Sequence, residues 1–388
     1  MVAAPVLSAP VVPPNTLQWL ALTLTEGLGP TRSKHLVEHF GGVAGIFRAS
    51  LTELEAAGLR AASAQSLFTG KSLDLAQQEM VKVAETKADI VTLDDPRYPQ
   101  RLKEIYDPPL VLYVRGSVEL LSFPGIAVVG TRHPTPYGVG MAERLACDLS
   151  NQGLSIISGL ARGVDTAAHR GTISAKGRTV AVMGTGVDEV YPRENKRIAE
   201  QILAMGGALI SEFAIGTPPT PQNFPIRNRI ISGMSVGVLV VEAAEYSGTR
   251  ITARCALEQS REVFAVPGNV TNKNAWGPNT LIKQGAKLVA TWEDVWEELP
   301  TQIRLQLMPA TVESSAGQTA SLFKDADLPP HEKKLLAALK ADESTQIDEL
   351  VERLENEVSP SEIFAALFEL ELSGKVKQLP GKNFVKSF

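Results

Sequence analysis

Seven short apolar segments alternate with helix-like stretches between residues 125 and 298, and this alternation limits the possible folds most. The segments are 126–129, 154–158, 179–183, 207–211, 236–241, 262–266 and 287–290. They lack the alternation of apolar and polar residues that is typical of a strand with one solvent-exposed face. We therefore expect parallel strands in a sheet that is covered on both faces. Right-handed crossovers between such strands give an extended, doubly wound, Rossmann-like α/β sheet.

The flanking segments predict further parts of the chain. Short helices joined by glycine turns precede the sheet and are typical of a small all-α domain of the SAM-like or helix-hairpin-helix class. Strand-like residues 90–93 and 110–114 would lengthen the sheet, and three helices with a hairpin after Pro329 indicate a winged helix. The expected limits are 1–14 for a disordered tail, 15–88 for the helical domain, 89–298 for the Rossmann-like domain, 299–328 for a linker and 329–388 for the winged helix.

Composition excludes several classes of protein. The chain has 388 residues, of which 44% are apolar and 21% charged, as in soluble proteins of several domains. No apolar stretch is long enough to span a bilayer, and residues 1–14 lack the basic start of a secretory signal. Cys147 and Cys255 lie in helix-like patterns and are expected to be small buried residues in a reducing cytoplasm.

Charge and ligand spacing narrow the choice of binding partner. No Cys/His cluster has the spacing of metal ligands, so we expect neither a metal nor a cofactor. The net charge of −5 does not indicate general affinity for nucleic acid. If DNA binds, a local patch in the middle segment must hold it.

Turns at the carboxyl ends of the expected strands carry the candidate ligand-binding residues, because ligands of open α/β sheets lie beyond those ends. Such turns present backbone N–H groups to anions, and arginine adds forked donors that match phosphate. Their convergence predicts a groove for several phosphates. In strand order the candidates are Gly130, Thr131 and Arg132; Ser158, Gly159 and Arg162; Gly184, Gly186, Arg193 and Lys196; Asn223, Phe224, Arg227, Asn228 and Arg229 at the end of a proline-rich loop; and Ser247, Gly248 and Thr249.

The first of these turns is the most informative. Gly130 ends an apolar strand, Thr135 suits the N-cap of the next helix and Pro136 suits its first position. A strand, a tight turn and a helix start together leave backbone N–H groups free for an anion. Arg132 would add a fixed positive charge.

Several candidates also have structural interpretations that the sequence leaves open. Arg162 and Asp165 are three residues apart and could pair with each other. Phe224 is as well suited to the core as to stacking on a base. The remaining two arginines, Arg227 and Arg229, could anchor their loop to Glu212 or Glu242.

Some activities have no support in the sequence. The first strand is followed by Gly-Thr-Arg rather than Gly-x-Gly-x-x-Gly, which disfavours a nicotinamide dinucleotide. A Gly-Lys-Ser/Thr loop for nucleoside triphosphates is absent. Neither His133 nor His169 has a serine or cysteine at a recognisable spacing, so no catalytic residue is expected.

The expected winged helix is unusual in its charge. Its third helix follows Ser359-Pro-Ser-Glu362, a capping box with proline at the first position. This helix would read DNA in a winged-helix transcription factor, yet it carries Glu362, Glu369 and Glu371. Contact with protein, or a regulatory role, is therefore a better prediction for this domain than reading a major groove.

Five ordered motifs resemble the DNA-processing protein family DprA, also called Smf. The resemblance extends over nearly the whole chain and includes all three expected domains. The motifs are Gly125–Gly138, Ile157–Asp165, Met183–Pro192, Asn223–Gly233 and Glu245–Thr249.

The resemblance implies a single-stranded DNA-binding recombination mediator rather than an enzyme. Members protect incoming strands during natural transformation, displace single-strand-binding protein and load the RecA recombinase, and they form homodimers through the Rossmann core. Carried over by motif, Arg132 would grip a phosphate, and Arg193 or Lys196 would line the same groove. Phe224 and the arginines at 227 and 229 would bracket the strand.

The alternative is an enzyme. The core also resembles nucleotide-cleaving phosphoribohydrolases of the "lonely guy" type, which place a glutamate shortly after a Gly-Thr at a helix start. Here Gly248-Thr249 is followed by no acid until Glu258.

Overall fold

The computed structural model describes residues 15–307, 329–339, 345–354, 359–372, 376–379 and 381–386. The chain divides into two compact units, Met1–Met308 and Pro309–Phe388. The tail expected at 1–14 and most of the expected linker, 308–328, lie outside the described residues. Among the described residues, no helix is both long and apolar enough to cross a membrane.

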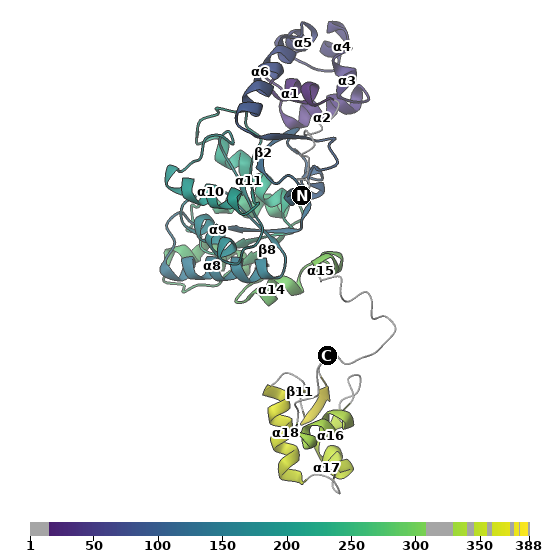
Figure 1. Cartoon of the computed structure of the whole chain (residues 1–388), viewed down its shortest axis with the longest axis vertical. Coiled ribbons are helices and arrows are strands. Elements are labelled where there is room, and N and C mark those ends of the chain that lie inside the picture. The colour runs from purple at the N-terminus through teal and green to yellow at the C-terminus, as the bar shows by residue number, and fades with distance from the viewer. Residues whose placement is uncertain are drawn as a thin grey trace, which may run out of the picture. The chain divides into compact units, whose positions relative to one another are not determined.

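The first unit begins with six helices, drawn in purple and blue in Figure 1. They are α1 (Thr16–Thr23), α2 (Pro30–His39), α3 (Val43–Ile46), α4 (Leu51–Ala56), α5 (Ala61–Phe68) and α6 (Lys71–Glu85). Leu20, Ile46 and Leu54 are fully buried between them. Ser50 and Glu53 form a capping box at the start of α4, which satisfies two backbone N–H groups there. The sequence prediction of short helices joined by glycine turns therefore agrees with this part of the structure.

A nine-stranded sheet forms the centre of the first unit, in the order β1-β2-β6-β5-β4-β3-β7-β8-β9. Strands β3 to β9 run parallel to their neighbours, whereas β1 and β2 add an antiparallel edge beside β6. The doubly wound, Rossmann-like sheet predicted from the sequence is thus confirmed. The strands are β1 (Asp89–Thr92), β2 (Val111–Gly116), β3 (Gly125–Val129), β4 (Ser155–Ser158), β5 (Thr179–Val182), β6 (Ala208–Ser211), β7 (Gly237–Val240), β8 (Glu262–Ala265) and β9 (Lys287–Leu288).

Helices cover both faces of the sheet, which explains the continuous apolar character of the strands. Ile126 and Val128 of β3 pack with α8, α9 and α14, whereas Ala127 and Val129 pack on the opposite face with α11 and α12. The helices of this part are α7 (Gln100–Lys103), α8 (Pro136–Asn151), α9 (Val164–Ser174), α10 (Lys196–Ala204), α11 (Asn223–Met234), α12 (Thr249–Glu258), α13 (Trp276–Lys283), α14 (Trp292–Glu297) and α15 (Thr301–Leu307).

The topology fixes where a ligand can bind. From β3 the chain adds β4, β5 and β6 on one side, and then crosses to add β7, β8 and β9 on the other. The loops that leave the carboxyl ends of β3 and β7 therefore diverge and leave a crevice between them. This switch point lies in the middle of the sheet.

Three sequence predictions need correction. Residues 223–229 form the first two turns of α11 instead of the end of a loop. Residues 301–307, expected to be linker, form α15, and its Ile303 and Leu307 pack against the core beside α8. Cys147 and Cys255 lie in helices but are only half-buried.

The second unit has the elements of a winged helix, as predicted. Its sheet has the order β10-β12-β11, and Leu350, Ile363 and Leu370 lie in its core. The predicted capping box is present, because the Glu362 N–H donates to Ser359 Oγ at 3.4 Å and the Ser359 N–H donates to Glu362 Oε2 at 3.0 Å. The elements are α16 (Pro330–Ala338), β10 (Thr345–Gln346), α17 (Ile347–Leu354), α18 (Pro360–Leu372), β11 (Val376–Leu379) and β12 (Asn383–Lys386).

Candidate functional site

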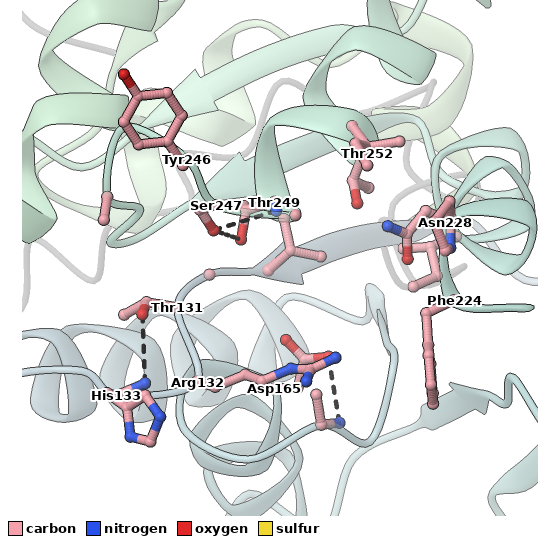
Figure 2. A pocket seen from close by; sticks show the side chains of 18 of the residues that line it. Thr131, Arg132, His133, Asp165, Phe224, Asn228, Tyr246, Ser247, Thr249 and Thr252 are labelled. Atoms are coloured by element: carbon pink, nitrogen blue, oxygen red, sulfur yellow. Dashed lines mark hydrogen bonds between the residues drawn. The ribbon is translucent and has the colours of Figure 1, made fainter. Parts of the chain in front are cut away.

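A pocket of about 1020 Å³ opens at the switch point, beyond the carboxyl ends of β3 and β7. Four segments supply most of its walls: the turn after β3, the turn after β4, one face of α11 and the loop from β7 into α12 (Figure 2). The predicted residues that line it are Gly130, Thr131, Arg132, Phe224, Arg227, Asn228, Ser247, Gly248 and Thr249. Nine of the predicted site residues are thus brought together here.

The start of α8 differs from the sequence prediction because a carboxylate of the protein already occupies it. Glu242, directly after β7, is 2% exposed. Its Oε2 accepts from the Thr135 N–H at 2.8 Å, and its Oε1 accepts from Thr135 Oγ1 at 2.6 Å. Thr135 caps α8 as predicted, and the Thr131 N–H donates to the Glu242 carbonyl at 2.6 Å. The N–H groups of Thr131 and Thr135 are therefore used within the protein, so Arg132 is the group of this turn best placed to hold an anion.

Arg132 provides the first of those side chains. It is exposed at the pocket, and its Cζ lies 5.6 Å from the centroid of the Phe224 ring. The Tyr191 ring lies 5.6 Å from the same ring, at an interplanar angle of 40°. An exposed cation beside two aromatic faces can engage a phosphate and a stacked base at the same time.

Phe224 is positioned by its helix and by a glycine. It is only partly buried, so the structure favours neither a pure core role nor full exposure. A Cβ at Gly184 would lie 2.8 Å from the ring, so the turn after β5 has to be glycine for Phe224 to rest there. Asn223 anchors the same helix start, because its Nδ2 donates to the Gly184 carbonyl at 3.0 Å.

Arg227 forms the inner wall of the pocket and is 4% exposed. Its Nη1 donates to the Val182 carbonyl, and its Nε has no hydrogen-bond partner within the protein. Gly159 leaves room for it, since a Cβ there would lie 2.1 Å from Nη1. The guanidinium is thus packed into the sheet edge, and little of it is accessible from the pocket.

Asp165 is the charge that faces Arg227 from the start of α9. Its Oδ2 accepts from the Gly159 N–H at 3.0 Å and from the Ala161 N–H at 3.3 Å. Burial raises the pKa of Asp165, against the opposing charge of Arg227. Burial lowers the pKa of Arg227 to about 10, and the nearby Arg132 adds to that shift. Arg227 therefore keeps its positive charge at neutral pH.

The loop between β7 and α12 forms the opposite wall. Ser247 Oγ donates to Thr249 Oγ1 at 2.9 Å and accepts from the Thr249 N–H at 3.2 Å, which orders the helix start. Thr252 lines the pocket one turn further along α12. Figure 2 shows Ser247 and Thr249 across the end of the strands from Arg132 and Asp165.

Arg229 lies outside the pocket, although the sequence groups it with Arg227. Its Nη1 and Nη2 bind the two carboxylate oxygens of Glu212 at 2.6 and 2.8 Å, and its Nε binds Asp107 at 2.9 Å. It is 7% exposed. The ion pair with Glu212 that the sequence left open is therefore present, and the guanidinium has no donor directed at the pocket.

The other predicted residues lie around the pocket rather than in its main lining. Arg162 pairs with Glu194 at 2.5 Å instead of Asp165, beside a small side cavity that Gly159 and Tyr191 also line. Ser158 Oγ donates to the Val128 carbonyl at 2.7 Å and is buried. Three predicted residues remain. The Gly186 N–H donates to the Thr217 carbonyl, and Arg193, just before α10, and Lys196, its first residue, are both exposed.

Sequence reasoning missed several residues that line the pocket. Tyr246 precedes Ser247, and Lys273 and Trp276 come from the segment that runs from β8 into the first residue of α13. That segment follows the strand next to β7, so the rule about carboxyl ends of strands could have identified it. Among the described residues, no group of three or more His, Cys, Asp or Glu side chains is arranged to hold a metal ion.

Two family models match the chain. The model described as DNA recombination-mediator protein A matches residues 89–300, and the model described as DprA winged helix domain matches residues 320–382. These matches cover the sheet that carries the pocket and the winged helix.

Named relatives share much of the sequence. Protein Smf of Escherichia coli K12 is 44% identical over 75% of this chain and 76% of its own length. DNA processing protein DprA of Bacillus subtilis is 47% identical over 56% of this chain and 73% of its own length. The crystal structure of DNA processing protein A from Streptococcus pneumoniae superposes with a TM-score of 0.66 at 35% identity and covers 73% of this chain and 98% of that one.

Proposed function

The chain belongs to the DNA recombination-mediator protein A family, and on this premise we propose that it binds single-stranded DNA across the pocket between β3 and β7. The observation that carries the proposal is the group formed by Arg132, Phe224 and Tyr191 at the edge of the pocket. A strand without sequence preference needs a cation for its phosphates and aromatic faces for its bases, and this group supplies both.

The start of α8 supports a polymer as ligand rather than a dinucleotide. In dinucleotide-binding sheets the pyrophosphate sits on the helix N-terminus after the first strand. Here Glu242 fills that position, and an added phosphate would meet its negative charge. Phosphates must instead follow the cations along the sheet edge. The proposed contacts are Gly130, Thr131, Arg132, Phe224, Arg227, Asn228, Ser247, Gly248 and Thr249, extended over the surface by Arg162, Arg193 and Lys196.

We further propose the cellular role that the family resemblance implies. The protein would protect incoming single strands during natural transformation, displace single-strand-binding protein and load the RecA recombinase onto them. It would act in the cytoplasm as a homodimer formed through the Rossmann core. Support for this role comes from the match to the recombination-mediator family and from the two relatives that carry the name DNA processing protein.

The test is a titration of a fluorescent single-stranded oligonucleotide against salt. Wild type is expected to lose affinity steeply as salt rises, because bound phosphates release counterions. Arg132→Ala is expected to weaken binding by about 1 to 3 kcal/mol, since it removes a charged hydrogen bond. Arg144→Ala is the matched control, because Arg144 is an exposed arginine of α8 outside the pocket, paired with Asp148. The proposal would be refuted if the protein bound duplex and single-stranded DNA equally well, or if Arg132→Ala and Arg144→Ala lost the same amount of affinity.

We also propose that the protein is not a phosphoribohydrolase. Glu258, the first acid after Gly248-Thr249, lies at the last position of α12 and pairs with Arg254 on an exposed surface. Asp165, a buried carboxylate that lines the pocket, accepts hydrogen bonds from two backbone N–H groups. Incubation with purine nucleoside monophosphates should release no free base. Base release that depends on Asp165 or Glu258 would overturn this conclusion.

A further inference from the structure

A second aromatic group lies in the same pocket, away from Phe224. Tyr246 is 92% exposed and Trp276 is 38% exposed, and both line the pocket. Figure 2 shows Tyr246 and Phe224 on opposite sides of the pocket. Tyr246 contributes almost nothing to the core, and more than a third of Trp276 stays accessible, so both rings present aromatic surface in the pocket.

The Trp276 ring is paired with a cation. The Cζ of Arg250 lies 5.2 Å from the centroid of the ring. The Nη1 of Arg250 donates to the Glu245 carbonyl at 2.8 Å, which fixes the guanidinium beside the ring. The pair repeats the arrangement of Arg132 and Phe224, whose separation is 5.6 Å. The pocket is therefore lined by two aromatic rings that each have an arginine beside them, although of the two arginines only Arg132 also lines the pocket.

Backbone contacts hold this second group in place. The Ala243 N–H donates to the Asn274 carbonyl at 2.7 Å, and the Gly277 N–H donates to the Ala243 carbonyl at 2.8 Å. A Cβ at Gly277 would lie 2.6 Å from that carbonyl oxygen, so only glycine allows α13 to approach so closely. These bonds join the loop that carries Tyr246 to the helix start that carries Trp276. A ring held in advance loses little conformational entropy when it binds.

The charge around the ring indicates what it binds. Lys273 lines the pocket beside Trp276, and Arg250 covers part of the ring. Cations next to a presented aromatic face match a nucleic acid strand, in which bases and phosphates alternate. The volume of about 1020 Å³ lies at the upper end of the roughly 300–1,000 Å³ found for small-molecule pockets, which leaves room for more than one base.

We propose that Trp276, with Arg250 and Tyr246, is a second base-stacking platform for the single DNA strand that also stacks on Phe224. This inference rests on the proposed function. It also predicts a minimum length for the DNA strand, because only an oligonucleotide that reaches from Phe224 to Trp276 can bind with full affinity. Phe224 and Trp276 then hold bases at two separate places along one strand. Lys273 and Arg250 neutralise the phosphates at the second place.

The experiment compares Trp276→Ala, Trp276→Phe and Phe224→Ala on oligo-dT strands of roughly 4 to 16 nucleotides. On the longest strand Trp276→Ala should bind roughly 5- to 150-fold more weakly than wild type, the range of one lost stacking contact. Trp276→Phe keeps an aromatic face and should retain most of the affinity. The shortest strands should not distinguish Trp276→Ala from wild type. Tyr106→Ala is the control, because Tyr106 is 79% exposed and does not line the pocket.

Fluorescence gives a second measurement that does not depend on a loss of affinity. Bases that stack on Trp276 should quench its emission, so saturating oligo-dT should quench wild type more than Trp276→Phe, which keeps the other three tryptophans. The inference would be overturned if wild type and Trp276→Phe were quenched equally and a folded Trp276→Ala bound strands of every length as wild type does. A loss of affinity in Phe224→Ala would then show that the proposed function itself still holds. Failure of wild type to bind any strand would instead overturn the proposed function.

Discussion

Gly159 and Arg227 provide the sharpest test of how the pocket wall is built. An alanine Cβ at 159 would lie 2.1 Å from Arg227 Nη1 and 2.6 Å from Cζ, closer than any real contact. The backbone at 159 is not in the left-handed region, so alanine itself is tolerated there. The whole effect of Gly159→Ala must therefore act through displacement of the guanidinium.

The expected cost follows from what Arg227 would lose. Its charged hydrogen bond to the Val182 carbonyl contributes about 1.5 to 3 kcal/mol, and overpacking of the wall adds about 1 to 3 kcal/mol. We expect Gly159→Ala to lower the free energy of unfolding by about 2.5 to 6 kcal/mol in urea denaturation. Gly140→Ala is the matched control, because Gly140 lies inside α8 and a Cβ added there would meet nothing within 4 Å. It should raise stability by about 0.5 to 1 kcal/mol.

A double-mutant cycle separates this explanation from a general intolerance of alanine. Arg227→Ala removes the group that the new Cβ would strike, so Gly159→Ala should cost less than about 1 kcal/mol in that background. A coupling energy near zero would refute the reasoning, as would a Gly159→Ala variant within about 0.5 kcal/mol of wild type.

Three further predictions concern single side chains. Phe224→Ala should weaken single-strand binding by about 1 to 3 kcal/mol in a fluorescence titration, whereas Phe224→Tyr should bind as wild type does; equal loss in both would argue against stacking. Arg229→Ala should lower the free energy of unfolding by about 3 kcal/mol, since it leaves Glu212 unpaired, with no change in DNA affinity of the folded protein. Burial lowers the pKa of His169 to about 3, so between that value and about 6.5 the unfolded chain binds a proton that the native state does not. Stability should therefore fall by about 2 kcal/mol from pH 7 to pH 5, and His169→Gln should remove this part of the slope; an unchanged slope would show that His169 is not the group responsible.

The strands could be predicted because both faces of the sheet are covered. Ile126 and Val128 face one layer of helices while Ala127 and Val129 face the other, so the run is apolar at every position. That pattern is local in the sequence. Right-handed crossovers between such strands give a doubly wound sheet, and ligands of such sheets are expected beyond the carboxyl ends of the strands.

The sequence could not predict that Arg227 lines the pocket while Arg229 pairs with Glu212, because the prediction placed both residues in a loop. Prolines at 218, 219 and 221 favour a loop, and Pro225 falls in the first turn of α11, where a helix tolerates it. On a helix, residues two apart point about 200° from each other. Arg227 therefore lines the pocket beside Phe224, while Arg229 reaches Glu212 on the other side.

The sequence also could not predict that Glu242 binds Thr135 at the start of α8. An acid directly after a strand has the same appearance whether it binds a ligand or caps a helix. Thr135 is 107 residues away in the chain, and only the parallel pairing of β3 with β7 brings the two together. Contacts of this kind depend on strand order, which local patterns do not encode.

The most direct test of the central claim is to locate the bound strand by photocross-linking. An oligonucleotide that carries 5-iodouracil at successive positions is bound to the full-length protein and irradiated, and the cross-linked residues are identified by mass spectrometry. We predict cross-links at Phe224, Tyr191, Tyr246 and Trp276, the phenylalanine, tyrosine and tryptophan side chains that line the pocket between β3 and β7. Cross-links confined to the helices at 16–85 or to the winged helix, with none in the pocket, would contradict it.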